Sequence, residues 1–153
     1  MNGNTQSTGL YIPGLAGLYA CLRPLAYPIV RIAAGGFLVP HGAQKLFGLW
    51  GGNINNVATG FGKLGLEPAL PLAYLVGITE FFGGLCIALG LFTRFWAAGG
   101  VILMSVIAFK AHLPSGWFGR GAEFPTLWLC LMIVVLIRGA GAFSLDRKIG
   151  KEL

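Results

Sequence analysis

The chain has 153 residues and a formal net charge of +6, yet only 10% of its residues are charged and 56% are hydrophobic. Together with a mean hydropathy of +0.75, this composition excludes an ordinary soluble domain and predicts an integral membrane protein whose main partner is the lipid bilayer. We expect no nucleic acid partner, because orientation in a membrane explains the placement of the cations.

The first 23 residues are predicted to lie outside the spanning part. Residues 1–9 are polar, whereas residues 10–22 are apolar. This apolar segment lacks the basic region of a signal peptide, and Pro13 weakens it as a span. We therefore expect a polar tail followed by a short helix that lies in the inner interface of the membrane.

Four apolar runs follow, and each is predicted to be a membrane-spanning helix. They cover residues 25–47, 68–91, 95–112 and 124–142. A helix needs roughly 20 residues to cross the hydrocarbon core, where lipid offers the backbone no hydrogen-bond partner. The predicted fold class is therefore an all-α integral membrane protein with a four-helix bundle in residues 24–146 and a basic tail in residues 147–153.

Most of the cations lie on one side of the predicted bundle. Arg23, Arg94, Arg138 and the basic tail fall on this side, and Lys63 and Arg120 on the other. By the positive-inside rule, both termini are predicted to be cytoplasmic, and the loops 48–67 and 113–122 to face outward.

Ionisable side chains inside the spans are the candidate functional residues, because such groups are costly in hydrocarbon and mark functional sites. On an ideal helix, Arg31, His41 and Lys45 lie within an arc of roughly 80° and must face inward. At roughly 1.5 Å per residue, His41, Glu80 and His112 lie at similar depth in the outer half. We predict a polar chamber that opens outward, with five ionisable residues: His41, Lys45, Glu80, His112 and Glu123.

Each of these residues also has a structural interpretation. An ion pair of Glu80 with Arg31 or Lys45 can simply fix the packing of the bundle. Glu123 can stabilise the N-terminus of the fourth helix, where the macrodipole favours an anion. Three further residues lie near enough to a span end to snorkel: Lys45, Lys110 and His112.

Four motifs occur in a fixed order along the chain. They are H-G-A-Q-K-L at residues 41–46, E-F-F-G-G at 80–84, L-G-L-F-T-R at 89–94 and G-A-F-S-L-D at 141–146. In this combination the chain resembles the DoxX family of bacterial membrane proteins. The resemblance implies a four-helix bundle in the bacterial cytoplasmic (inner) membrane and sulfur or thiol redox chemistry coupled to quinone. Relatives include the large subunit of thiosulfate:quinone oxidoreductase.

A quinone site assigns a role to each candidate residue. Proton and hydrogen-bond donors are needed near the two carbonyl oxygens, and His41 and Lys45 can supply them while Glu80 and Glu123 relay protons. The candidate quinone-binding residues are Arg31, His112 and the aromatic Phe81, Phe82 and Phe109.

The sequence contains no electron carrier that we recognise. It has no dinucleotide fingerprint, flavin signature or C-x-x-C pair. Electrons would come from a small donor such as thiosulfate, held by Lys45 and Arg120, or from a partner protein. Haem on His41 and His112, or a metal held with Glu80 and Glu123, has no diagnostic spacing, and we expect neither.

Two other classes of function remain open. One is a non-catalytic accessory subunit that packs against a larger membrane complex, and the other is transport of a small anion or proton through an oligomer. The expected protein partner is accordingly another membrane protein or a second copy of the chain.

Overall fold

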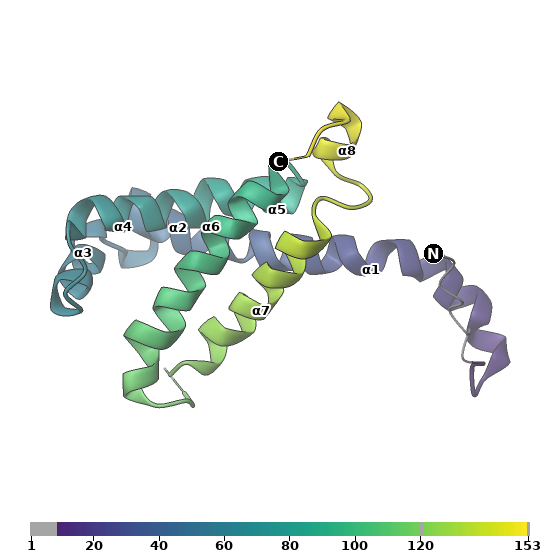
Figure 1. Cartoon of the computed structure of the whole chain (residues 1–153), viewed down its shortest axis with the longest axis horizontal. Coiled ribbons are helices and arrows are strands. Elements are labelled where there is room, and N and C mark those ends of the chain that lie inside the picture. Colours follow the sequence, from purple (N-terminus) through teal and green to yellow (C-terminus); the bar gives the residue numbers. More distant parts are fainter. Residues whose placement is uncertain (1–8, 120, 153) are drawn as a thin grey trace.

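The computed structural model describes residues 9–119 and 121–152, and this part of the chain consists of helices and the loops between them (Figure 1). The α-helices are α1 (Ala16–Gly36), α2 (Leu38–Phe47), α3 (Ile54–Lys63), α4 (Ala69–Ile78), α5 (Gly84–Leu89), α6 (Thr93–Ser105), α7 (Glu123–Arg138) and α8 (Leu145–Ile149). Two π-helical segments interrupt or extend them: η3 (Thr79–Gly83) and η4 (Val106–His112). Short 3-10 turns are η1 (Pro13–Leu15), η2 (Leu49–Gly51) and η5 (Leu113–Ser115).

Within the described residues, three continuous helical stretches are long and apolar enough to cross a membrane. They are Pro13–Phe47 with 35 residues, Ala69–Leu89 with 21 and Thr93–Ser115 with 23. The described part of the chain is therefore all-helical with multiple candidate spans, as the apolar runs in the sequence predict.

Helix α7 packs along α6 but is shorter than the predicted fourth span (Figure 1). It has 16 residues, a length of roughly 24 Å, and ends at Arg138 rather than at Ala142. The next residue, Gly139, has a φ of 76°, a positive value that glycine adopts readily and that does not continue the helix.

The N-terminal part of α1 differs from the predicted separate interfacial helix. Helix α1 begins at Ala16 and runs without a break through Pro24 and Pro28. Each proline removes only one backbone donor, which a long apolar helix tolerates. Figure 1 shows this part of α1 projecting beyond the other helices, and its large side chains, such as Leu18 and Leu22, are exposed.

Glycines bring two pairs of helices into backbone contact. A Cβ atom on Gly42 of α2 would lie 2.3 Å from the backbone nitrogen of Phe81 in η3. A Cβ atom on Gly35 of α1 would lie 2.4 Å from the carbonyl oxygen of Gly84 in α5. Small residues permit this approach, and in lipid close packing is a main source of helix association.

Arg31 does not face the predicted chamber. Its side chain is 1% exposed and donates hydrogen bonds to the carbonyl oxygens of Ala140, Phe143 (2.9 Å) and Ala88 (3.3 Å). The guanidinium thus joins the end of α5 to the loop that follows α7, because its several donors satisfy carbonyls that the helices leave unpaired.

Asp146 fixes the same end of the molecule. Its carboxylate accepts hydrogen bonds from the backbone nitrogens of Phe92 (2.8 Å) and Thr93 (3.0 Å) and from the Thr93 hydroxyl (2.8 Å). These nitrogens lie at the start of α6, where an anion compensates the helix dipole. The contacts hold α8 against the turn between α5 and α6.

We expect Gly42→Ala to lower the free energy of unfolding by about 1–3 kcal/mol, because its methyl group meets backbone rather than a flexible side chain. Gly36→Ala is the matched control, since a Cβ atom there has no neighbour within 4 Å. Thermal unfolding of both variants in the same detergent checks the prediction. Equal stability of the two variants would contradict the close contact between α2 and η3.

Candidate functional site

A cavity of about 790 Å³ lies between α2, η3, the α6–η4 helix and the start of α7. Four of the residues that the sequence assigns to the polar chamber line it: His41, Lys45, Glu80 and His112. The structure therefore brings together side chains from three helical stretches that are far apart in the sequence.

The centre of the polar wall is an ion pair. Lys45 Nζ lies 2.5 Å from Glu80 Oε2, and it also lies 3.3 Å from the carbonyl oxygen of His41. The Glu80 side chain is only 4% exposed, whereas that of Lys45 is 20% exposed. A carboxylate this deeply buried needs a cation or a proton, and Lys45 rather than Arg31 provides the positive charge.

Both π-helical segments contribute an ionisable residue to this cavity. Glu80 belongs to η3, and His112 is the last residue of η4. Segments of π-helix are rare in proteins and occur frequently at functional sites, because the wider turn changes the direction of the side chains. Two of them meeting at one cavity distinguish this place from the rest of the described structure.

The ring of His112 is held in one orientation. Its Nδ1 atom lies 3.0 Å from the carbonyl oxygen of Ile107. Since a carbonyl oxygen only accepts hydrogen bonds, Nδ1 must carry the hydrogen in this contact. The other ring nitrogen, Nε2, is then the atom available to a ligand.

Aromatic and apolar residues form the rest of the wall. The larger ones are Leu38, Phe61, Met104, Phe124 and Trp128. The indole of Trp128 is positioned by a hydrogen bond from its Nε1 to the carbonyl oxygen of Ala34, at 3.0 Å. Thus α7 contributes a fixed aromatic ring to the side of the cavity facing α1.

Several predicted site residues lie outside the described lining of the cavity. Glu123 is exposed in the first turn of α7, the place its structural interpretation requires, although the neighbouring Phe124 and Pro125 do line the cavity. Arg31 is engaged at the other end of the bundle. Lys110 is exposed and is not among the residues that line the cavity.

The three predicted aromatic residues are also elsewhere. Phe82 and Phe109 are 47% and 55% exposed on the outside of the helices. Phe81 packs edge-on against Phe47 and Phe82, with ring centroids 5.1 and 5.0 Å apart. The aromatic wall comes instead from Phe61, Phe124 and Trp128. Phe61 lies on α3, within residues 48–67, which the sequence predicts to be a loop.

The donor set does not match a metal centre. Among the described residues, no group of three or more His, Cys, Asp or Glu side chains is placed to hold a metal ion. Arg120, the second predicted anion-binding residue, lies outside the described residues.

We expect Lys45→Met to lower the free energy of unfolding by about 3 kcal/mol, because it leaves the buried Glu80 carboxylate without a cation. Glu80→Gln should be milder, since the more exposed Lys45 ammonium retains access to water. Adding Glu80→Gln to Lys45→Met should therefore restore stability, which a double-mutant cycle in detergent measures. Additive losses in the double variant would mean that the pair is not coupled.

Comparison with known proteins supports the assignment that the motifs suggest. The DoxX family profile matches residues 26–113, which include the polar cavity residues from α2, η3 and η4. An uncharacterised protein of Haemophilus influenzae is 29% identical over 139 residues, which is 85% of this chain and 95% of the relative. A second uncharacterised protein of the same organism is 34% identical over 64 residues, covering 40% of this chain and 42% of the relative.

No solved structure matches this chain significantly. The family profile nevertheless covers more than half of the residues, and it contains the H-G-x-x-K and E-x-x-G-G motifs from which the cavity is built. The chain therefore belongs to the DoxX family of membrane proteins.

Proposed function

We propose that the cavity binds the head group of a membrane quinone and that the protein is the quinone-linked component of a membrane redox system. The observation that carries this proposal is the Lys45–Glu80 pair in a cavity between apolar helices, with His41 and His112 on the same wall. Charged groups within such helices mark sites of function, since packing alone does not require them.

The residues that line the cavity fit a quinone ring. A volume of about 790 Å³ falls within the range of small-molecule sites, which combine apolar walls with a few polar groups. The two carbonyl oxygens of a quinone require hydrogen-bond donors, and Lys45 and His41 carry N–H groups on this wall. Trp128 and Phe61 supply flat apolar surface for the ring.

Reduction of a quinone to a quinol consumes two electrons and two protons. Two thiols that are oxidised to a disulfide release both, so a thiol donor balances the reaction without another reactant. Within the cavity, Lys45 can give a proton to the reduced oxygen, and the exposed His41 can pass one to Lys45 from the aqueous side. The contact with Glu80 holds the Lys45 side chain at the cavity wall between these steps.

The electron donor belongs to a partner or to a small sulfur compound. The sequence offers no recognisable dinucleotide, flavin or cysteine-cluster motif, and Cys21, Cys86 and Cys130 are free and far apart in sequence. In this arrangement the DoxX protein contributes the quinone site. The thiol or sulfur compound is oxidised at a separate place, where it or the partner protein binds.

We also propose four spans with both termini on the cytoplasmic side of a bacterial cytoplasmic membrane. Arg94 donates a 2.9 Å hydrogen bond to the carbonyl oxygen of Leu136, and Arg138 lies 5.4 Å from the centroid of the Tyr27 ring. Both cations thus lie at the end where α8 packs, as the positive-inside rule requires of a cytoplasmic face. Helix α7 supplies the fourth span, its shorter length being accommodated by local thinning of the bilayer.

A second candidate function is a non-catalytic accessory subunit. The projecting part of α1 favours it, because its large apolar side chains are exposed and are available to a larger membrane protein (Figure 1). In that case the polar cavity has a structural role.

Ligand binding by variants separates the two functions. We expect His41→Ala and Glu80→Gln to weaken binding of a short-chain quinone by at least about tenfold, equivalent to about 1.4 kcal/mol. Lys110→Gln, an exposed cation outside the cavity, is the matched control and should bind like the unmodified protein. Isothermal titration in one detergent gives the affinities, and thermal unfolding verifies folding. Unchanged quinone affinity in both cavity variants would favour the accessory subunit.

A further inference from the structure

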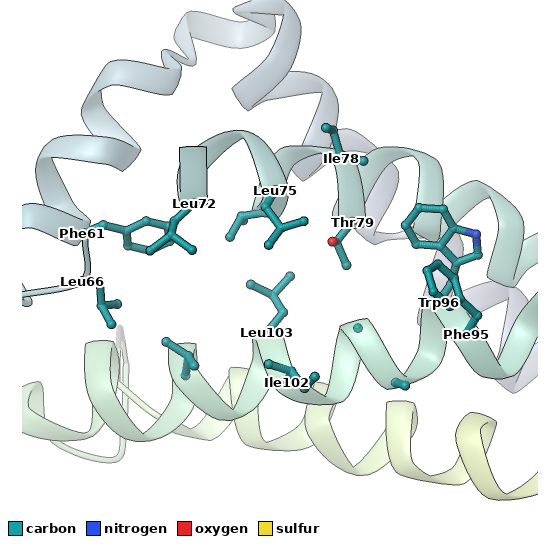
Figure 2. Close-up of a pocket in the computed structure, with 14 residues that line it drawn as sticks. Phe61, Leu66, Leu72, Leu75, Ile78, Thr79, Phe95, Trp96, Ile102 and Leu103 are labelled. Atoms are coloured by element: carbon teal, nitrogen blue, oxygen red, sulfur yellow. The ribbon is translucent and has the colours of Figure 1, made fainter. Parts of the chain in front are cut away.

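A second cavity, here called the apolar groove, runs between the α4–η3 helix and α6 (Figure 2). Its volume is about 530 Å³. Among the described residues that line it, Thr79 has the only oxygen-bearing side chain. The groove therefore suits an apolar ligand and offers no group that would recognise a charge.

The shape of the groove is elongated. Figure 2 shows Phe61 and Leu66 at one end and Phe95 and Trp96 at the other. Along α6 and η4, the lining runs from Phe95 to Val106, which is roughly 16 Å at the rise of a helix. An elongated groove of this length accommodates a chain better than a ring system.

The apolar groove adjoins the polar cavity. Phe61 of α3 lines both. On η3, Thr79 lines the groove and the next residue, Glu80, lines the cavity. On α6, Leu103 lines the groove and the next residue, Met104, lines the cavity. The two spaces thus lie on either side of the line along which η3 packs on α6, and they meet at Phe61.

We propose that the apolar groove holds the prenyl tail of the same quinone whose head group lies beside Lys45 and Glu80. This inference rests on the proposed function. An amphipathic molecule matches the arrangement, because its ring meets the ion pair and its tail passes Phe61 into a groove without charge.

The groove has to recognise the tail by shape. Lipid tails are as apolar as leucine, so a prenyl chain gains no hydrophobic free energy by moving from the bilayer into the protein. Any preference for a tailed ligand must then come from close packing against the walls. Filling the groove with a side chain should remove that preference and leave the head-group site unchanged.

Gly99→Leu is the variant that tests this inference. A Cβ atom on Gly99 would lie 3.6 Å from Thr79 Cγ2, an ordinary contact, so the larger side chain can extend into the groove that Gly99 lines. Gly36→Leu is the matched control, because a Cβ atom there meets nothing within 4 Å and Gly36 lines neither space. A second variant, Leu75→Trp, narrows the groove from a side chain that is 58% exposed and so disturbs little packing.

The measurement is the ratio of affinities for a prenylated and a tail-less quinone with the same ring, in the same detergent for every variant. Partition of the tailed quinone into micelles then affects all variants equally. We expect the unmodified protein and Gly36→Leu to prefer the tailed quinone by about tenfold. Gly99→Leu and Leu75→Trp should lose this preference while binding the tail-less quinone normally.

The outcomes separate the two proposals. A preference that persists in the groove variants overturns the tail site and leaves the proposed function in place. Absence of tail-less quinone binding by the unmodified protein overturns the proposed function and this inference with it. If Gly99→Leu also fails to bind the tail-less quinone, the head-group site is disturbed, and the result with Leu75→Trp decides.

Discussion

The ion pair between Lys45 and Glu80 is the constraint around which the polar cavity is organised. Glu80 is almost completely buried within an apolar helix, and an unpaired carboxylate there would cost several kcal/mol. Lys45 reaches it because Gly42, three residues earlier on α2, allows the backbone of α2 to lie against Phe81 of η3.

The H-G-x-x-K motif therefore supplies two features of the site. Its glycine permits the close contact between α2 and η3, and its lysine is the cation that this contact brings to Glu80. His41, next to the same glycine, is placed beside the pair at the cavity wall.

The four sequence motifs fall into two groups at opposite ends of the helices. The first two motifs form the cavity and the close contacts beside it. The last two motifs hold the opposite end of the helices together. There Asp146 accepts hydrogen bonds from the start of α6, and Arg31 donates to carbonyl groups of the loop after α7. At the cavity end, the π-helical segments and α3 supply the lining residues. The apolar groove lies alongside, so the same η3 segment presents Thr79 to a lipid-like space and Glu80 to a polar one.

Much of this arrangement can be predicted from the sequence, and the features that cannot be predicted have identifiable physical causes. Hydropathy predicts the apolar helices, and counting residues along them predicts that His41, Glu80 and His112 lie at one depth, where they share a cavity. The α-helical period cannot predict which side chains after Glu80 face that cavity. The wider turn of the π-helix changes the direction in which the following side chains point. Phe81, Phe82 and Phe109 each follow the start of a π-helical segment, and none of them is among the residues that line the cavity. The sequence does not predict the hydrogen bonds of Arg31, since its partners are carbonyl groups more than 50 residues away along the chain. It does not predict Phe61 as a cavity residue either, because α3 is a short amphipathic helix between the predicted spans.

Photolabelling in membranes with a quinone that carries an azide on its ring tests the central claim most directly. Mass spectrometry of the digested protein then identifies the labelled residues without any assumption about turnover. The account predicts labels on residues that line the cavity from different helices, such as Leu38, Met104 and Trp128, and protection of all of them by excess unlabelled quinone. Labels confined to the exposed side chains of α1 and unaffected by competition would contradict it. In that case the Lys45–Glu80 pair is a packing device, and the function of the protein lies in what α1 contacts.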